Sequence, residues 1–287
     1  MEALAIKPDG VYVDVTFGGG GHSKELLRQL GPNGKLYGFD QDPDALRNVI
    51  DDGRFVLIHQ NFRFLKNNLR LHGVREVDGI LADLGVSSHQ FDSAERGFST
   101  RFEAVLDMRM DQAGELDARQ VLNTYSEAEL HRIFGMYGEL QNARTLAKTI
   151  VTARASQPLH TVETLKSVVK KVVPRGKEHK YYAQLFQALR IEVNGELEAL
   201  QEFLQQSVSM LKPGGRLVVM SYHSLEDRLV KNFMAKGKFK GEVEKDFFGR
   251  EIKPLKLVTR KAMVATEAEV SHNSRARSAK LRAAEKV

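Results

Sequence analysis

A run of four glycines is the feature of this sequence that most plainly suggests chemistry. Residues 14–22 read Asp-Val-Thr-Phe-Gly-Gly-Gly-Gly-His, between an apolar, strand-like run and a helical pattern. Because glycine has no Cβ atom, such a turn can approach a ligand closely, while the N–H groups that open the helix face that ligand. Asp40 follows Gly20 by twenty residues, at the end of the strand-like run 35–39, where it is placed to accept hydrogen bonds from ribose hydroxyls. The sequence therefore predicts a cofactor that contains adenosine.

Two classes of such cofactor use this arrangement, and the residues after the glycines distinguish them. A dinucleotide site needs Gly or Ala where Ser23 stands, because the backbone must approach a pyrophosphate. The phosphate-loop pattern also fails, since Lys24 follows Ser23 and no Gly-Lys-Ser/Thr sequence occurs here. S-adenosylmethionine has no phosphate and needs only the turn, the acid and a slot for adenine. A methyltransferase is therefore favoured, with a dehydrogenase and a purely structural glycine turn as the alternatives.

Composition sets further limits on the function. The chain has 287 residues, 42% of them hydrophobic, which is enough for a core in one large domain or two modest ones. Met1 opens no signal-peptide pattern, and no run approaches the roughly 20 apolar residues that span a bilayer. We therefore expect a cytoplasmic protein without membrane contact.

The sequence contains no cysteine, which excludes disulfides, thiolate metal sites and iron–sulfur chemistry. Enzymes that methylate carbon 5 of pyrimidines generally need a cysteine thiolate to add to the ring. That reaction is disfavoured, whereas methylation on nitrogen or oxygen stays open. No metal is expected either, because the nine histidines show no ligand spacing.

Positive charge is concentrated towards the C-terminus. Residues 228–287 hold 16 Lys/Arg and 7 Asp/Glu, whereas residues 1–227 hold 27 and 30. Such asymmetry favours a polyanionic partner, with a solvated basic tail as the alternative. A second group of cations could bind a nucleic-acid backbone or form a solvated helix face: Lys166, Lys170, Lys171, Arg175, Lys177 and Lys180.

Strand-like and helical patterns alternate at the start of the chain, which predicts a parallel, doubly wound sheet. The strand-like runs are 11–16, 35–40, 54–60, 77–84 and, after a turn at 212–215, 216–220. A helical region lies between the fourth and the fifth of these runs, and in it Ser126 and Glu129 form a capping-box pattern. We assign residues 1–102 and 184–287 to a discontinuous cofactor-binding core, and 103–183 to an inserted helical domain for substrate recognition. The stretch 183–211 reads as a long helical stretch, 235–250 as an exposed loop or ribbon, and the last 17 residues as a basic tail.

Six segments in this order closely resemble the ribosomal RNA small-subunit methyltransferase H family, also called MraW. They are Thr16–Ser23, Asp83–Ser88 with Gln90, Leu106–Asp111, Phe186–Asn194, Ser221–Arg228 and Arg275–Arg282. The resemblance implies a Rossmann-like class I methyltransferase fold with a helical insert. It also implies transfer of a methyl group from S-adenosylmethionine to the exocyclic N4 of a cytidine in the decoding region of bacterial 16S ribosomal RNA. The expected partner is this small-subunit RNA or the small ribosomal subunit.

The resemblance also assigns residues of the cofactor site. Those expected to bind the cofactor are Gly20, Gly21, His22, Asp40, Phe64, Asp83 and Gln90. Position along the chain, and not the resemblance, gives those expected to act on the target base: Asp83 at the end of the fourth strand, and Ser221 and His223 just past the next strand, where a doubly wound sheet presents its site residues. The sequence departs from the family pattern at His89 and Ser274, which replace prolines, and at Lys180-Tyr-Tyr182.

Each assignment has a plainer alternative. Asp83 could bind only the methionine amino group, and Phe64 could be a core aromatic residue. The pattern Ser224–Asp227 is a capping box, so the segment after the strand could simply start a helix. Asp107, Arg109 and Asp111 could face a flipped nucleotide or form surface ion pairs.

Three functional classes follow from these observations. The first is the RNA cytidine N4-methyltransferase, whose target base would leave its stack and enter a cleft between core and insert. The second is a non-catalytic ribosome-assembly or RNA-binding factor that keeps the fold and the basic tail. The third is a nicotinamide-dependent oxidoreductase, against which Ser23 counts.

Overall fold

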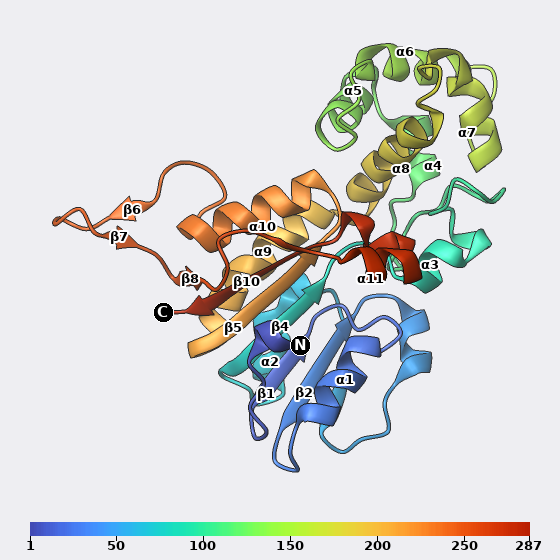
Figure 1. The fold of residues 1–287 in the computed structure, drawn as a ribbon. Coiled ribbons are helices and arrows are strands. Elements are labelled where there is room, and N and C mark those ends of the chain that lie inside the picture. The colour runs from blue at the N-terminus through green and yellow to red at the C-terminus, as the bar shows by residue number, and fades with distance from the viewer. The chain divides into compact units, whose positions relative to one another are not determined.

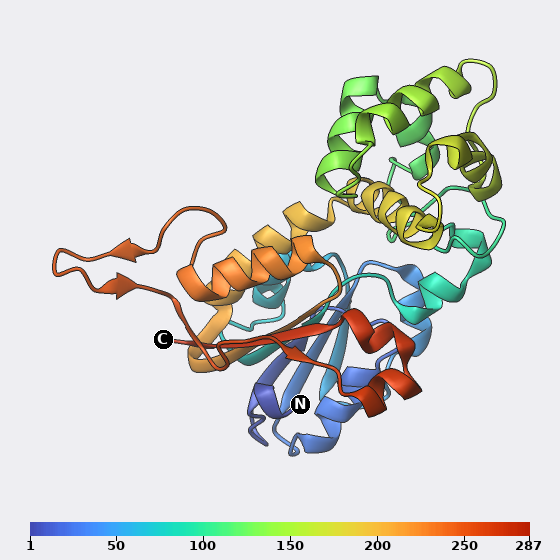
Figure 2. The same cartoon turned by 45° about the horizontal axis from the view of Figure 1, so that its top comes forward.

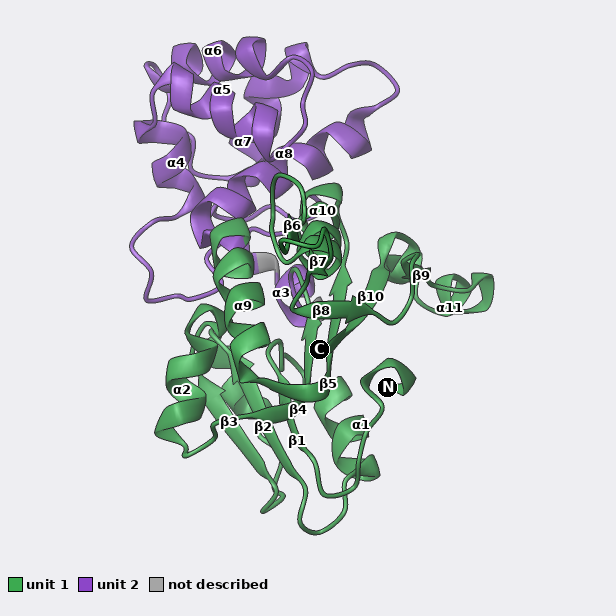
Figure 3. Ribbon diagram, turned by 90° about the vertical axis from the view of Figure 1, so that its left-hand side faces the viewer, with its two compact units in different colours: residues 1–85, 197–287 green, residues 86–196 purple. Residues whose placement is uncertain are grey.

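The computed structural model describes residues 1–287 except Ser88 and Ala94, and the chain divides into two compact units (Figure 3). The first, here called the sheet unit, consists of Met1–Gly85 and Leu197–Val287. The second, the helical unit, is Val86–Glu196. The insert expected at 103–183 lies inside the helical unit, which extends beyond it at both ends.

The sheet unit is built on one mixed sheet of eight strands. Its order is β3-β2-β1-β4-β5-β10-β8, and β9 pairs with β10. Strands β1 to β5 are parallel, whereas β10 is antiparallel to its neighbours. The doubly wound, mostly parallel sheet predicted from the sequence is therefore confirmed. The strands are β1 (Val11–Asp14), β2 (Lys35–Asp40), β3 (Phe55–His59), β4 (Val77–Asp83), β5 (Leu211–Ser221), β8 (Leu255–Leu257), β9 (Met263–Val264) and β10 (Lys280–Lys286).

Helices cover both faces of this sheet (Figure 1). One face packs its apolar residues against Leu26 and Leu27 of α1, and the other against α2, α9 and α10. Because the strand order reverses between β1 and β4, their carboxyl ends flank the crevice where such folds bind ligands. The helices are α1 (Gly21–Gln29), α2 (Leu65–Leu71), α9 (Glu196–Met210), α10 (Ser224–Lys236) and α11 (Glu267–His272), with 3₁₀ turns η1 (Glu2–Leu4), η2 (Pro43–Asn48), η3 (Phe62–Phe64) and η6 (Ser274–Ser278).

The helical unit has its own apolar core, in which Leu130, Ile133 and Phe134 are fully buried. Ser126 caps the helix that carries them, and its side chain and that of Glu129 form the predicted capping box. The elements are α3 (Ser88–Asp92), η4 (Ala94–Arg96), α4 (Ala118–Thr124), α5 (Glu127–Met136), α6 (Ala143–Arg154), α7 (Val162–Val169), η5 (Lys170–Val172) and α8 (Glu178–Asn194). Across the described parts of both units, no helix has the length and apolar character needed to cross a membrane.

The predicted helical stretch 183–211 consists of two helices, α8 and α9, because Gly195 takes a left-handed conformation (φ 55°) that ends α8. One feature of the predicted chain organisation was wrong. The expected turn at 212–215 lies within β5 as a bulge, since Val77 pairs with Leu211 and Gly79 with Arg216.

The predicted basic tail was also wrong, because residues 280–286 form strand β10 between β5 and β8. Its two buried residues are only alanines, Ala283 and Ala284, so the strand has little apolar signature. Its charges are paired instead: Arg282 Nε donates to Asp227 Oδ1 over 2.7 Å, and Glu285 pairs with Arg216 at 2.8 Å.

The predicted ribbon is confirmed as a two-stranded antiparallel hairpin. Its strands are β6 (Glu244–Lys245) and β7 (Glu251–Ile252), and they pair only with each other. The hairpin extends away from the sheet of its own unit (Figures 1 and 2).

Candidate active site

The glycine turn joins β1 to α1 in the predicted position. Gly18 and Gly20 have φ values of 50° and 74°, which side chains rarely adopt, and Gly20 is the N-cap of α1. Gly19 and Gly21 differ, because a Cβ atom added at either position would meet no atom within 4 Å. The protein's own packing therefore does not require glycine there. An open backbone surface at a helix N-terminus fits a ligand that approaches the turn closely.

Asp40 lies at the end of β2, directly against this turn. Its Oδ2 accepts a hydrogen bond from Gly18 N at 2.7 Å, and its Oδ1 accepts one from Asp42 N at 2.9 Å. Burial raises the pKa of the Asp40 carboxyl, although these two N–H groups act in the opposite direction. The acid predicted to read the ribose is thus fixed beside the glycines, as that role requires.

Asp83, at the carboxyl end of β4, is the centre of a polar cluster. Its Oδ1 accepts a 2.7 Å hydrogen bond from the hydroxyl of Tyr222, which follows β5. Its Oδ2 lies 3.3 Å from His22 Nε2, in the first turn of α1. Its backbone N–H donates to Thr16 Oγ1 at 2.7 Å. Three segments far apart in sequence meet here because the carboxyl ends of β1, β4 and β5 adjoin in the parallel sheet.

The hydrogen bonds and the burial of this cluster shift the pKa of two of its members. Burial, followed by the Asp83 charge, raises the pKa of Tyr222 well above its usual range, so the phenol stays protonated and donates. The hydrogen bond to Asp83 raises the pKa of His22, more than burial lowers it. Asp83 is 28% exposed, so this oriented carboxylate is accessible from solvent.

Asp14 is a further acidic residue next to the glycine turn. Asp14 is fully buried, and its Oδ2 accepts a 2.7 Å hydrogen bond from the hydroxyl of Ser23, which is also fully buried. Burial raises the pKa of Asp14. Sequence reasoning treated Ser23 only as a departure from the dinucleotide pattern and did not single out Asp14. An acid that ends an apolar strand nine residues before a serine was the available signal.

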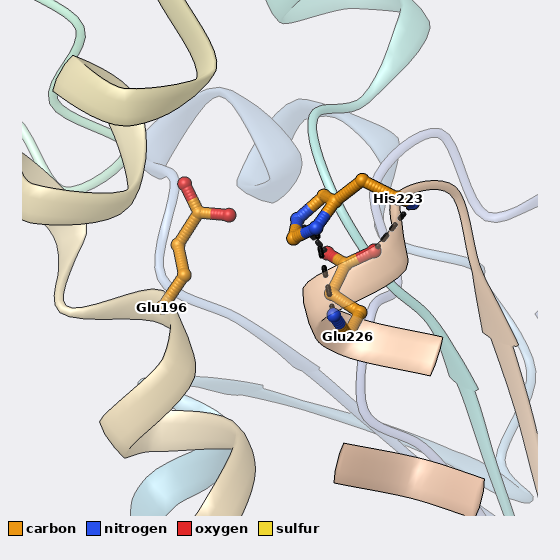
Figure 4. Close-up of side chains that lie close together, drawn as sticks. All are labelled: Glu196, His223 and Glu226. Carbon is orange, nitrogen blue, oxygen red and sulfur yellow. Dashed lines mark hydrogen bonds and ion pairs between the residues drawn. The ribbon is translucent and has the colours of Figure 1, made fainter. Parts of the chain in front are cut away.

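His223 and Ser221 have structural partners. His223, not Ser224, is the N-cap of α10, so the predicted capping box was placed one residue too late. The imidazole lies against Glu226, and the two residues are joined by hydrogen bonds (Figure 4). The Glu226 carboxylate also accepts from Tyr222 N at 2.9 Å. Ser221 is 1% exposed, and its hydroxyl donates to Lys280 O at 3.4 Å. Tyr222, which lies between them and was not predicted, is the residue that contacts Asp83.

The remaining predicted residues lie in both units. Phe64 is in the sheet unit, where its ring is 46% exposed and Arg63 lies over it at 6.0 Å, so it is not a core aromatic residue. Gln90 is in the helical unit, and its side-chain oxygen accepts from Ser87 N as part of a capping box for α3. Asp107 and Arg109 form an ion pair at 2.7 Å in the same unit.

The cations predicted to grip RNA lie on α7, α8 and the segment between them. Lys170 and Lys171 are exposed, whereas Lys166 is half-buried and donates to Thr100 O at 3.1 Å. Lys166 Nζ also lies 5.4 Å from the centre of the Tyr182 ring. Lys166, Lys170 and Tyr182 line an open pocket of about 460 Å³ within the helical unit. This surface combines cations with an aromatic ring.

Comparisons with known proteins found relatives over the whole length of the chain. A model of the MraW methylase family matches residues 1–287. The chain is 60% identical to the ribosomal RNA small subunit methyltransferase H of Flavobacterium johnsoniae, over 100% of this chain and 95% of that protein. It is 54% identical to the protein of that name from Bacteroides thetaiotaomicron, over 100% and 94%. A solved rRNA methylase from Streptococcus thermophilus is 14% identical, with a TM-score of 0.41 over 100% of this chain and 93% of that one.

Proposed function

This chain belongs to the MraW methylase family, and we propose that it methylates the exocyclic N4 of a cytidine in the decoding region of bacterial small-subunit ribosomal RNA, with S-adenosylmethionine as methyl donor. The curated relatives, at 54–60% identity, carry the name of a ribosomal RNA small-subunit methyltransferase. The observation that carries the proposal is the oriented carboxylate of Asp83 beside an open glycine turn.

The residues present fit the proposed cofactor. Gly19 and Gly21 leave the backbone of the turn open, and Asp40 is fixed at its side with lone pairs for ribose hydroxyls. The half-exposed ring of Phe64 offers a face for adenine. S-adenosylmethionine, when bound, supplies a methyl group on a positively charged sulfur. No phosphate-binding lysine is needed, in accord with the Ser23–Lys24 sequence.

Asp83 is the residue that we assign to the target amine. The lone pair of cytosine N4 is delocalised into the ring, so an acceptor that holds an N4 hydrogen localises that pair and balances the positive charge that develops. Tyr222 fixes one oxygen of Asp83 by a hydrogen bond, and His22 lies against the other. A carboxylate held in this way is oriented before the substrate arrives, which reduces the entropy lost in reaching a reactive geometry.

We assign RNA binding to exposed cations of the helical unit. Lys170 and Lys171 are suited to phosphates, which position an RNA without reading its sequence. Because a paired or stacked cytosine cannot reach a buried cofactor, we propose that the target base leaves its stack during the reaction.

The test is methyl transfer from labelled S-adenosylmethionine to small ribosomal subunits isolated from a strain that lacks this protein. Nucleoside mass spectrometry then identifies the modified base, and N4-methylated cytidine is the expected product. Label on another base would support S-adenosylmethionine as the methyl donor but would contradict cytidine N4 as the acceptor. Cofactor binding without label in either subunits or naked RNA would favour a non-catalytic assembly factor.

The variant Asp83→Asn separates the two roles of that residue: loss of turnover with unchanged cofactor affinity supports action on the amine.

A further inference from the structure

We propose that the tip of the β6–β7 hairpin is an RNA-docking element whose two phenylalanine rings stack on unpaired bases of the substrate RNA. This inference rests on the proposed function for the identity of the RNA, but not for its own evidence. The hairpin tip is defined here as Asp246–Arg250, the turn that joins β6 to β7.

The two rings are exposed to a degree that folding does not explain. Phe247 is 97% exposed and Phe248 is 79% exposed, although phenylalanine is among the residues most often buried. They contact each other, with ring centres 5.7 Å apart and planes at 86°. Two perpendicular rings present faces in two directions, so each can receive a base.

The tip is an ordered turn and not a loose loop. Asp246 Oδ1 accepts hydrogen bonds from Phe248 N at 2.9 Å and from Arg250 N at 2.8 Å. Asp246 N donates to Arg250 O at 2.9 Å, and Gly249 N donates to Asp246 O at 3.0 Å. These bonds hold the two phenylalanines on the outside of the turn, which lowers the entropy cost of binding through them.

Both ends of the hairpin are fixed to the core of the sheet unit. Phe239 stacks on Phe233 of α10 at 5.0 Å, and Asn232 donates to Phe239 O at 3.1 Å. At the other end Leu255 is 1% exposed in β8. The sequence therefore contains phenylalanines of two kinds within ten residues: Phe239 anchors the hairpin, whereas Phe247 and Phe248 have no comparable packing.

The positive charge around the two rings favours a nucleic acid as the binding partner. Residues 236–261, the hairpin with its base, hold nine Lys/Arg and four Asp/Glu, in a chain whose net charge is +6. Two of the four acids are already neutralised, since Glu244 pairs with Lys238 and Glu251 with Lys253. The Arg250 guanidinium also lies 5.8 Å from the centre of the Phe248 ring. Aromatic faces among cations are the pattern with which proteins bind unpaired nucleotides, because every base has a face to stack.

The test compares variants that alter the rings in different ways. Phe247→Leu with Phe248→Leu keeps apolar side chains but removes aromatic faces, whereas Phe247→Tyr with Phe248→Tyr keeps both. Leu71→Ala, which shortens an 84% exposed side chain on α2, is the control for loss of an exposed apolar group. Affinity for small ribosomal subunits is measured by filter binding, and methyl transfer is measured separately on the same samples.

The leucine pair is expected to weaken subunit binding by about tenfold or more, the value for one lost stacked base, while the tyrosine pair and the control bind as the parent does. Equal binding by the leucine and tyrosine pairs would overturn the proposal in favour of an apolar protein contact. If the parent binds subunits without transferring methyl groups, the proposed function fails, but the binding comparison still decides this inference.

A direct contact map completes the test. Because the chain has no cysteine, Lys245→Cys gives a single thiol beside the tip for attachment of a photo-crosslinking reagent and keeps both rings. Crosslinks to an unpaired segment of the subunit RNA are expected. Crosslinks only to a ribosomal protein or to a second copy of this chain would contradict the proposal.

Discussion

Tyr222 donates a 2.7 Å hydrogen bond to Asp83, and so ties the end of β5 to the end of β4 at the centre of the candidate site. The two residues lie 139 positions apart, and the whole helical unit is inserted between them. This bond leaves Asp83 Oδ2 to His22, so each oxygen of the carboxylate has its own partner. The relationship makes Tyr222 the natural first target for mutation.

Tyr222→Phe is expected to lower the rate of methyl transfer and to leave the fold intact. A hydrogen bond to a charged group contributes about 1.5–3 kcal/mol, which corresponds to about a tenfold to hundredfold change in rate. The matched control is Tyr125→Phe, since the Tyr125 hydroxyl also donates to a carboxylate, that of Glu192 at 3.1 Å, within the helical unit. Single-turnover rates are the measurement. An equal loss of rate in both variants would show that the effect is not specific to Asp83.

Asp40→Ala is expected to weaken cofactor binding by about tenfold or more, because the proposed ribose acceptor is lost and Gly18 N loses its partner. Asp40→Asn should be milder, since an amide oxygen still accepts from Gly18. Isothermal titration with S-adenosylmethionine measures the affinity. Affinity for the RNA should stay unchanged, and a parallel fall in RNA affinity would indicate a misfolded variant.

The ion pair between His22 and Asp83 predicts a pH dependence. The hydrogen bond to Asp83 raises the pKa of His22 above 6.5 in the folded state. The stabilisation is therefore complete below the unfolded value of about 6.5 and is lost as the pH rises through the folded value. Nuclear magnetic resonance titration of the imidazole, assigned with His22→Gln, tests this directly. In Asp83→Asn the pKa should fall, whereas in Asp52→Asn, which alters an ion pair with Arg54, it should not.

Asp14 is expected to matter for stability through its hydrogen bonds and not through its charge. Asp14→Ala leaves the buried Ser23 hydroxyl without its acceptor and should cost about 1–3 kcal/mol in the free energy of unfolding. Asp14→Asn keeps a polar partner and should cost less. Because burial raises the pKa of Asp14, stability from this group is present below its unfolded pKa and lost as the pH rises through the folded value. The free energy of unfolding, measured with urea at several pH values, should therefore rise for Asp14→Asn relative to the parent as the pH increases.

Lys170→Glu with Lys171→Glu is expected to weaken RNA binding and to leave cofactor affinity unchanged. Loss of two phosphate contacts should also change the salt dependence: the plot of the logarithm of the binding constant against the logarithm of the salt concentration should become less steep by about two units. The control, Arg144→Glu with Lys148→Glu, makes the same charge change on the exposed side of α6. If the control weakens RNA binding as much, the effect is one of net charge and not of this surface.

The first four strands were predictable because each combines an apolar run with punctuating turns. The predicted runs 35–40 and 77–84 match β2 and β4 to within one residue. Strand β10 was missed because it buries only Ala283 and Ala284, and its charged residues are satisfied by partners on β5 and α10. Sequence patterns report burial of large apolar groups, and they are silent where a strand is held by backbone and ion pairs.

The site was predictable to the level of its segments but not of its side chains. Ser221 and His223 attracted attention as polar residues after a strand, yet Tyr222 between them contacts Asp83. Which of three consecutive residues faces the crevice depends on where β5 ends and α10 begins, and His223 as N-cap shifts that boundary by one residue. The shared burial of Asp14 and Ser23 likewise depends on a turn whose exact path no local pattern specifies.

The position of β10 also determines the order in which the protein can assemble as it is made. Strands β1 to β4 leave the ribosome first, but the free edge of β4 waits for β5 until the helical unit has been synthesised. The edge of β5 waits in turn for residues 280–286, after the hairpin has emerged. An unpaired edge invites association with other chains, so the nascent protein carries a reactive edge through most of its translation. Completion of the sheet is thus a late event.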